Sequence, residues 1–329
     1  MAKKTVFSGI QATGSLHLGN YLGAISNWVK MQEEYDNYFC VVDLHTITVP
    51  QDPEILKANI REVAGLLFAA GIDEKNSVVF IQSYVKGHSE LAWIFNCVTP
   101  MGWLHRMTQF KEKSEKQKDE VSVGLFDYPV LQAADILLYD AHLVPVGEDQ
   151  KQHVELCRDI AQRFNYRYGE VFVLPDALIP PVGGRVMGLL NPEKKMSKSE
   201  ENLNDAIFLL DTPDEIGAKI KRATTDSQRE ICFDQNRPGV TNLLTIYELL
   251  TGKSRTEIED HFSGKNYSVL KGELTEVVSE SLRPLQERYR ELTDEKGYLD
   301  EMLARGAEKA GEQAERKIRQ VHEHLGLRK

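Results

Sequence analysis

The sequence predicts an α/β protein with a doubly wound parallel sheet, followed by a smaller all-helical domain. Strand-like and helix-like segments alternate over residues 1–190, which is the pattern of βα units in a parallel sheet. Several of the strands are continuous apolar runs, as expected of strands that are covered on both faces. Beyond about Asn191 strand signals nearly cease and helical periodicity takes over.

The elements of residues 1–190 follow in a regular order. Apolar runs predict strands at Thr5–Phe7, Tyr38–Val42, Val78–Ile81, Leu143–Val146 and Val171–Leu174. Helical patterns lie between them: Leu18–Tyr35, Pro53 to Gly71 with Asp52 as N-cap, Glu90–Lys118 interrupted near Pro100, a helix opening at Pro129, and one from Asp149 to Phe164. Parallel sheets bind ligands at the carboxyl ends of their strands, so the loops after Phe7, Val42 and Val146 are the places to look for chemistry.

Residues 191–295 are predicted to form the helical domain. Its helices are expected at Pro213–Arg222, Thr241–Leu250, Glu257–Phe262 and Leu270–Arg290, with Gly252 as a C-cap. A last helix, Tyr298 to about Leu325, carries only a thin apolar stripe. We expect this segment (296–329) to pack back on the first domain, although periodicity does not say against which element.

Composition and charge exclude several classes of protein. Lys and Arg number 40 against 50 Asp and Glu, so a chain that is basic over its whole surface is excluded, whereas a local basic face is not. The four cysteines are far apart, which argues against a protein-bound metal cluster. The longest apolar run, Val63–Ile72, is about half of what a bilayer requires. Because no apolar leader follows Met1, we expect a cytoplasmic protein. Neither a membrane nor DNA is an expected partner.

The loop after the first strand contains a glycine-rich turn, from Gly9 to Asn20. His17 and Asn20 stand three residues apart at the start of a helix, where backbone N–H groups already favour anions. They could donate hydrogen bonds to phosphate oxygens. On spacing alone, a plain strand–helix turn with a capping histidine is also open.

A lysine-rich segment follows the fifth predicted strand, at Lys194–Ser199. Lysine is a compact charge on a mobile stem, and ammonium groups over a triphosphate would stabilise a departing pyrophosphate. A basic solvated linker is the alternative for this run taken by itself.

Two further segments carry polar groups. Tyr128, Gln132 and Asp135 share one helix face, where a buried carboxylate could accept a hydrogen bond from a substrate; the alternative is that they only cap and solvate the helix. Gly147, Glu148 and Asp149 follow a strand, and such acceptors suit ribose hydroxyls, although Asp149 would also serve as an N-cap. A metal site of Glu148, Asp149 and His153 is a weaker interpretation, so no metal ligand is predicted.

His17-Leu18-Gly19-Asn20 after strand one and Lys195-Met196-Ser197-Lys198-Ser199 after strand five resemble the two motifs of class I aminoacyl-tRNA synthetases. The pentad matches the family letter for letter, whereas Asn20 replaces the second histidine of the first motif. Blocks at Gly9–Ala24, Met107–Lys111, Ala133–Leu137 and Val144–Gln150 resemble the bacterial tryptophanyl-tRNA synthetases, and the likeness is weakest in the last 80 or so residues.

The resemblance implies a tryptophan–tRNA ligase that uses ATP with Mg²⁺, acts on L-tryptophan and tRNA(Trp), and forms a homodimer. It implies catalytic roles for His17, Lys195 and Lys198. It places near ATP the residues Gln11, Ala12, Thr13, Gly19, Asn20, Gly147, Glu148, Asp149, Val186, Lys195, Met196, Ser197, Lys198 and Ser199. It places Asp135 at the indole N–H, Tyr128 and Gln150 at the α-amino group, and Phe7, Gly9 and Val144 around the ring. Many relatives have Met where Gln132 stands, so this amide either adds a contact to the indole or faces water.

Two rival functions stay open. The first is a tyrosyl-tRNA synthetase, which shares the fold. The second is a non-catalytic, synthetase-like protein that binds RNA but does not catalyse aminoacylation. For tRNA phosphates we expect Lys219, Lys221, Arg222, Arg229 and the run Lys111–Lys118. The apolar stretch from Trp93 to Leu104 is the candidate dimer interface, though core packing explains it about as well.

Overall fold

The computed structural model describes residues 3–109, 121–147, 150–179, 185–197, 202–228, 230–295 and 297–327. Within these ranges one parallel sheet has the strand order β3-β2-β1-β4-β5. Its strands are β1 (Thr5–Ile10), β2 (Asp36–Val41), β3 (Ser77–Ile81), β4 (Leu143–Pro145) and β5 (Asp176–Leu178). The register pairs Thr5 with Asp36, Asn37 with Ser77, Val6 with Leu143, and Leu143 with Asp176. The predicted doubly wound sheet is confirmed.

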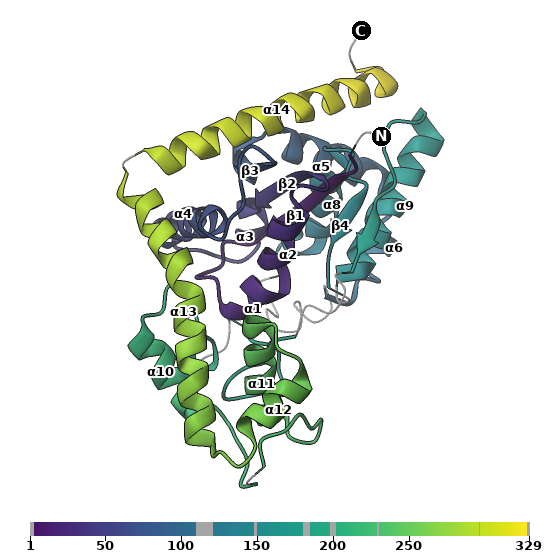
Figure 1. Ribbon diagram of the computed structural model, residues 1–329. Coiled ribbons are helices and arrows are strands. Elements are labelled where there is room, and N and C mark those ends of the chain that lie inside the picture. The colour runs from purple at the N-terminus through teal and green to yellow at the C-terminus, as the bar shows by residue number, and fades with distance from the viewer. Residues whose placement is uncertain are drawn as a thin grey trace.

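Helices fill the connections between the strands and make up most of the remaining chain (Figure 1). Those of the first part are α1 (Leu18–Asn20), α2 (Ser26–Met31), α3 (Asp43–Thr46), α4 (Pro53–Ala69), α5 (Gly87–Val98), α6 (Met101–Leu104), α8 (Val123–Leu137) and α9 (Lys151–Tyr168). A π-helix, Tyr21–Ile25, joins α1 to α2, and 3-10 turns lie at Gln82–Tyr84 and Leu203–Asp205. The later helices are α10 (Pro213–Arg222), α11 (Pro238–Thr251), α12 (Arg255–Phe262), α13 (Tyr267–Asp294) and α14 (Tyr298–Leu325).

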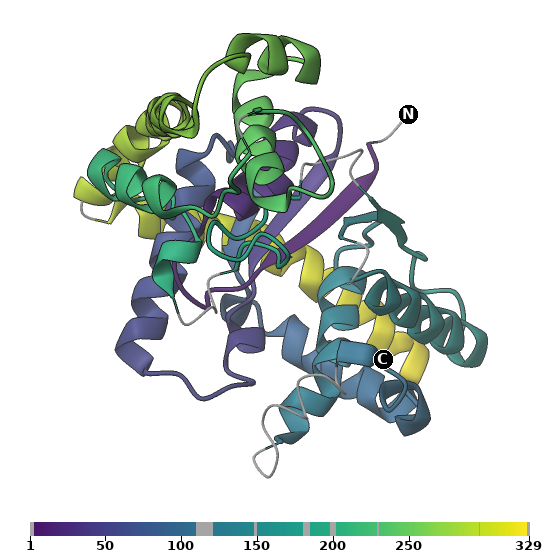
Figure 2. The ribbon, with the colours of Figure 1, turned by 90° about the horizontal axis from the view of Figure 1, so that it is seen from below.

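Alternate residues of the strands point into two apolar cores, one on each face of the sheet. Phe39 and Val41 enter the core beneath α2 and α4, which continues without a break into α10–α13. Cys40 and Phe80 enter the core formed with α5, α8 and α9. Figure 2 shows the green helices α10–α13 and the teal helices α8 and α9 on opposite sides of the strands. No helix in the described ranges is both long and apolar enough to cross a bilayer.

The last helix, α14, crosses the sheet at its edge strand β3 (Figure 1). Leu299 and Leu303 belong to the first core, whereas Ala310 and Ile318 belong to the second. At the crossing, a Cβ atom on Gly306 would lie 1.8 Å from the carbonyl oxygen of Val79, so only glycine permits this approach. The helix thereby covers an edge that would otherwise be exposed.

Four predicted elements differ most from the structure, and α9 also departs from its prediction, with Gln150 rather than Asp149 at the N-cap position and an end at Tyr168. The fifth strand is not Val171–Leu174 but β5, because the Asn165 side-chain oxygen accepts the backbone N–H groups of Val171 and Phe172. Pro129 does not open a helix; it lies inside α8, which begins after Ser122, whose hydroxyl accepts the N–H of Leu125. The first helix ends at Met31 and contains the π-helical turn. The Glu90–Lys118 stretch is α5 and α6 before residue 110, and residues 110–120 lie outside the described ranges.

Candidate active site

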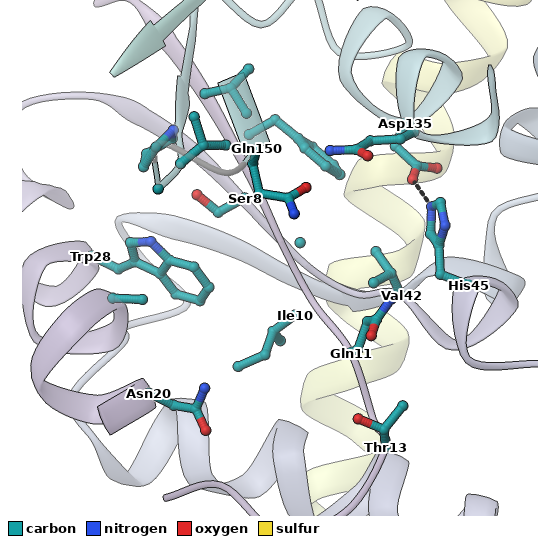
Figure 3. Close-up of a pocket in the computed structure, with 18 of the residues that line it drawn as sticks. Ser8, Ile10, Gln11, Thr13, Asn20, Trp28, Val42, His45, Asp135 and Gln150 are labelled. Atoms are coloured by element: carbon teal, nitrogen blue, oxygen red, sulfur yellow. Dashed lines mark hydrogen bonds and ion pairs between the residues drawn. The ribbon is translucent and has the colours of Figure 1, made fainter. Parts of the chain in front are cut away.

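A cavity of about 700 Å³ opens at the carboxyl ends of β1 and β4. The strand order reverses between these two strands: β2 and β3 lie on one side of β1, whereas β4 and β5 lie on its other side. Ligands of doubly wound sheets bind at such a switch point. Figure 3 shows Asp135 and His45 at one end of the cavity and Thr13 and Asn20 at the other.

The turn after β1 supplies one wall, and its histidine is a helix cap. Nδ1 of His17 accepts the backbone N–H of Asn20 at 3.3 Å, and Oδ1 of Asn20 accepts the N–H of His17 at 3.1 Å. Gly14 adopts a φ of +125° in this turn, which favours glycine. Because Nδ1 acts as an acceptor, a neutral His17 ring carries its proton on Nε2. The prediction of a capping histidine is therefore confirmed. It leaves Nε2 of His17, which lines the cavity, as a possible donor to a ligand.

The lysine segment begins in a short hairpin rather than in an open loop. Met187 and Lys195 form an antiparallel bridge, with Gly188 N–H bonded to the carbonyl of Lys194 and Met196 N–H to that of Val186. The exposed Lys195 side chain lines the cavity, as do Met196 and Ser197. The hairpin thus holds one cationic side chain opposite the His17 turn.

Two buried side chains of the helical part hold this hairpin. Asn242 on α11 accepts the N–H of Met187 and donates to its carbonyl, both at 2.9 Å. The Asp205 carboxylate accepts the N–H groups of Leu190 and Asn191 at 2.6 and 2.9 Å. A Cβ atom on Gly188 would lie 2.3 Å from Oδ2 of Asp205, so this close packing requires glycine.

The same stretch also holds the His17 turn. Leu18 N–H bonds to the carbonyl of Ile207 at 2.8 Å, and Leu209 N–H bonds to that of Leu16 at 2.9 Å. Asp205, which holds the lysine hairpin, precedes Ile207 by two positions. Residues 205–209 therefore tie the two motifs together, although the motifs stand far apart in the sequence.

The other end of the cavity is built around Asp135, which is 1% exposed. Its Oδ1 accepts hydrogen bonds from Gln82 and His88, both at 2.6 Å, and its Oδ2 accepts one from His45 at 2.7 Å. Burial alone would raise the pKa of this carboxyl, but His45 and His88, as charge partners and donors, hold the pKa well below its ordinary value. The cavity therefore contains a buried carboxylate that accepts hydrogen bonds.

Tyr128 stands beside this carboxylate on α8. Its hydroxyl lies 3.0 Å from Nε2 of His153 and donates to Oε1 of Gln109 at 3.2 Å. Burial raises the pKa of Tyr128 to about 12, so the phenol stays protonated at neutral pH.

Most of the predicted site residues line this one cavity. They are Phe7, Gly9, Gln11, Thr13, His17, Asn20, Tyr128, Gln132, Asp135, Val144, Gly147, Gln150, Lys195, Met196 and Ser197. Ala12, Gly19 and Val186 are buried behind this wall rather than on it. Glu148, Asp149, Lys198 and Ser199 lie outside the described residues. Among the described residues no three His, Cys, Asp or Glu side chains gather as metal ligands.

Sequence reasoning missed several residues of the site. His45 follows β2, after Val42, where the sequence analysis expected chemistry. No motif around His45 marked it as a partner of Asp135. Trp28 also lines the cavity and carried no signal in the pattern. Gln109 lines it too, and it lies in the Met107–Lys111 block, to which no role was assigned. Lys219 is not available to a phosphate, because it is buried, pairs with Asp211 at 2.6 Å and lies over the ring of Phe208. Arg229 and the Lys111–Lys118 run lie outside the described residues.

Comparisons with known proteins agree with this geometry. The model of the tRNA synthetases class I (W and Y) family matches residues 2–283. A tryptophan–tRNA ligase of Wolinella succinogenes is 55% identical over 327 residues, which cover 99% of this chain and 100% of that protein.

Solved structures are similar over the whole length. Tryptophanyl-tRNA synthetase of Mycoplasma pneumoniae has a TM-score of 0.90 at 36% identity, covering 99% of this chain and 98% of that one. The Campylobacter jejuni synthetase, in complex with ADP and tryptophan, has a TM-score of 0.87 at 37% identity, covering 98% and 100%.

Proposed function

The chain belongs to the class I tRNA synthetases of the tryptophan and tyrosine group, and we propose that it activates L-tryptophan with ATP and transfers it to tRNA(Trp). One observation carries this function. A single cavity joins the His17 turn and the Lys195 hairpin at one end to a buried carboxylate, Asp135, at the other. A nucleotide triphosphate and an aromatic amino acid bound there would meet at their reacting groups.

At the nucleotide end, His17 would donate from Nε2 to a phosphate oxygen, and Lys195 would neutralise charge on the departing pyrophosphate. Mg²⁺ would enter as part of the substrate, on the phosphate oxygens of ATP. We assign Lys198 and Ser199 to the same phosphates, and Glu148 and Asp149 to the ribose, on the family motif alone. Gln11, Thr13 and Asn20, which line this end, would contact the nucleotide.

At the amino-acid end, Asp135 would accept the indole N–H, and Tyr128 and Gln150 would hold the α-amino group. Phe7, Gly9 and Val144 would enclose the ring, with Gln132 at its edge. A buried acceptor meant for an indole N–H is left unpaired by phenylalanine, which costs on the order of 10⁴-fold in specificity. The length of the pocket would exclude tyrosine, which also offers a donor.

The reaction needs no protein nucleophile. The tryptophan carboxylate attacks the α-phosphorus of ATP, pyrophosphate leaves, and the acyl group then passes from the adenylate to the terminal ribose of tRNA. The residues of the cavity would contribute by positioning both substrates and by stabilising the charge that builds on the phosphates.

Pyrophosphate exchange with a panel of amino acids tests the proposal. We expect exchange that depends on tryptophan. Exchange that depends on tyrosine would show the related synthetase instead, and no exchange with any amino acid would show a non-catalytic RNA-binding protein.

We also propose that residues 191–295 bind the tRNA anticodon stem, with exposed Lys221 and Arg222 of α10 at its phosphates. Replacing both by Ala should reduce the salt dependence of tRNA binding while leaving pyrophosphate exchange unchanged. Exposed Lys57 on α4 provides the matched control. Salt dependence that is the same in both variants would contradict this assignment.

For the homodimer, we propose an interface around Trp93 and Met101, which are 70% and 65% exposed, whereas Ile94, Phe95 and Leu104 of the same stretch are buried in the core. A patch of several exposed apolar side chains marks an interaction surface, whereas a single exposed apolar side chain is ordinary. In analytical ultracentrifugation, the wild type should sediment as a dimer with twice the 37.3 kDa mass of the chain. The Trp93→Asp variant should sediment as a monomer. Tyr166→Asp, at a residue 91% exposed, is the control that should stay dimeric.

A further inference from the structure

Behind Asp135 lies a chain of buried hydrogen bonds that no substrate can reach. His88 donates from Nδ1 to Oδ1 of Asp135 at 2.6 Å, and its Nε2 lies 2.8 Å from the hydroxyl of Tyr139. His88 is 0% exposed and Tyr139 1% exposed, and neither lines the cavity.

The two carboxylate oxygens of Asp135 have different surroundings. Oδ1 is enclosed by Gln82 and His88, which are both fully buried. Oδ2 has His45 as its partner, and His45 lines the cavity, as Figure 3 shows. Oδ2 is therefore the oxygen that a ligand can meet.

The hydrogen-bond pattern also assigns the protons. An ionised carboxylate only accepts, so Nδ1 of His88 carries a proton and donates it, while Nε2 shares a second hydrogen bond with the hydroxyl of Tyr139. The orientation of Gln82 is set in the same way, because its Oε1 accepts the N–H of Leu44 at 3.1 Å and leaves Nε2 to donate.

We propose that His88 and Tyr139 are positioning residues for indole recognition, which hold Asp135 ionised with Oδ2 turned toward the indole N–H. This inference rests on the proposed contact between Asp135 and the substrate. It assigns selectivity for an N–H group to two residues that never touch the substrate.

Other titratable groups do not substitute for His88. The groups that face Asp135 are His45 on α3, His88 on α5, Tyr139 just beyond α8, Cys40 on β2 and Cys157 on α9. Burial raises the pKa of both thiols and of the Tyr139 phenol, so these three stay neutral at physiological pH. Removing His88 would leave Oδ1 with one donor fewer on its buried side, and the pKa of Asp135 would rise.

The test compares the binding of L-tryptophan with that of its benzothiophene analogue, in which sulfur replaces the indole N–H. Isothermal titration between about pH 5.5 and about pH 8 measures both on the full-length chain. In the wild type, the preference for tryptophan should not vary with pH. In His88→Leu the preference should fall by about tenfold at the acidic end and recover as pH rises, because protonated Asp135 is a poorer acceptor.

Two further variants keep the test decisive. His88→Asn should restore most of the preference, since an amide can donate where Nδ1 did. Tyr139→Phe should reduce the preference for tryptophan by about threefold. Because this variant keeps the ring that stacks on Phe7 and Tyr38, it can test the proposal even if His88→Leu does not fold. Tyr38→Phe is the matched control, because it removes a hydroxyl from the same stack but not from this chain of bonds.

The outcomes separate the two proposals. If the wild type binds both ligands equally, the contact of Asp135 with the indole N–H is wrong, and the site assignment with it. If the wild type prefers tryptophan and His88→Leu and Tyr139→Phe keep that preference at every pH, only the positioning role is wrong. An equal loss for both ligands, with their ratio unchanged, would show a structural role and overturn the inference.

Discussion

Met196 lies against Gly19: a Cβ atom on Gly19 would stand 3.5 Å from the Cβ of Met196 and 3.0 Å from Nδ1 of His17. The two sequence motifs, one after β1 and one beyond β5, are thus in contact. Had His17 and Lys195 lain on opposite faces of the molecule, the synthetase interpretation would have failed.

We predict that Gly19→Ala weakens the use of ATP. The added methyl group would force the His17 ring, which caps α1, to shift by a few tenths of an ångström, while its contact with Met196 would be an ordinary one. The value of kcat/KM for ATP should fall by about tenfold while the affinity for tryptophan stays unchanged. Gly23→Ala is the control, because its Cβ would meet no atom within 4 Å. Equal effects of the two substitutions would contradict this role.

Lys195→Ala should lower the rate of pyrophosphate exchange by the equivalent of about 2–4 kcal/mol of barrier and barely alter tryptophan affinity. The ammonium group would act on charge that develops only in the transition state. Lys194→Ala removes the same charge one residue earlier, where the side chain does not line the cavity, and should have little effect. A fall in affinity without a fall in turnover would show that Lys195 binds substrate instead.

Asn242→Ala should disturb the lysine hairpin from a distance. It leaves the N–H and the carbonyl of Met187 without their partner, opposite Lys195 in the hairpin. We expect kcat/KM for ATP to fall by about tenfold. In the Lys195→Ala background the same change should have little further effect, as a double-mutant cycle measures. Thr245→Ala, on the same helix, is the control; additive losses would show that the two residues act separately.

Gly306→Ala should destabilise the protein, because its Cβ would lie 1.8 Å from the carbonyl oxygen of Val79. We expect a loss of about 1–3 kcal/mol in the free energy of unfolding, measured with urea. Gly311→Ala on the same helix meets no atom within 4 Å and should stabilise by up to ~1 kcal/mol through helix propensity. A neutral Gly306→Ala would mean that α14 does not press on β3.

Tyr128 should stay protonated far into the alkaline range, because burial raises its pKa to about 12. The difference in phenolate absorbance between the wild type and Tyr128→Phe should stay near zero through about pH 10 and rise toward pH 12. Since the folded pKa is the higher one, this group contributes stability that is complete below the unfolded pKa and is lost as pH rises through the folded pKa. Phenolate absorbance appearing near pH 10 would contradict the burial.

Local patterns predicted much of the fold. The apolar runs located β1–β4, because a strand covered on both faces needs apolar side chains throughout. Asp52 and Pro53 marked the start of α4, and the bounds of α10 and α14 agree with the structure residue for residue. These features depend on neighbours within a few positions, and the residues that form them are visible in any short window of sequence.

The failures at the fifth strand and at Pro129 have different causes. Val171–Leu174 has the apolar pattern of a strand. However, Phe172 is buried in the second core, and the Asn165 side chain forms hydrogen bonds with both the N–H and the carbonyl of Phe172. The strand that pairs with β4 is Asp176–Leu178. Pro129 follows a rule for helix starts, but the cap at Ser122 decides where α8 begins. In the first place the pairing with β4, a tertiary contact, selects the strand, whereas in the second a nearby cap starts the helix before Pro129.

The sequence by itself determined the order of the elements, the two motifs and the candidate residues of the cavity. Only the tertiary structure decided that Asp135 would be enclosed by Gln82, His88 and His45, and that residues 205–209 would hold both motifs. The physical reason is that a buried carboxylate and a backbone hairpin must find their hydrogen-bond partners wherever the packed chain brings them. Those partners come from separate strands and helices, and no local pattern in the sequence records their pairing.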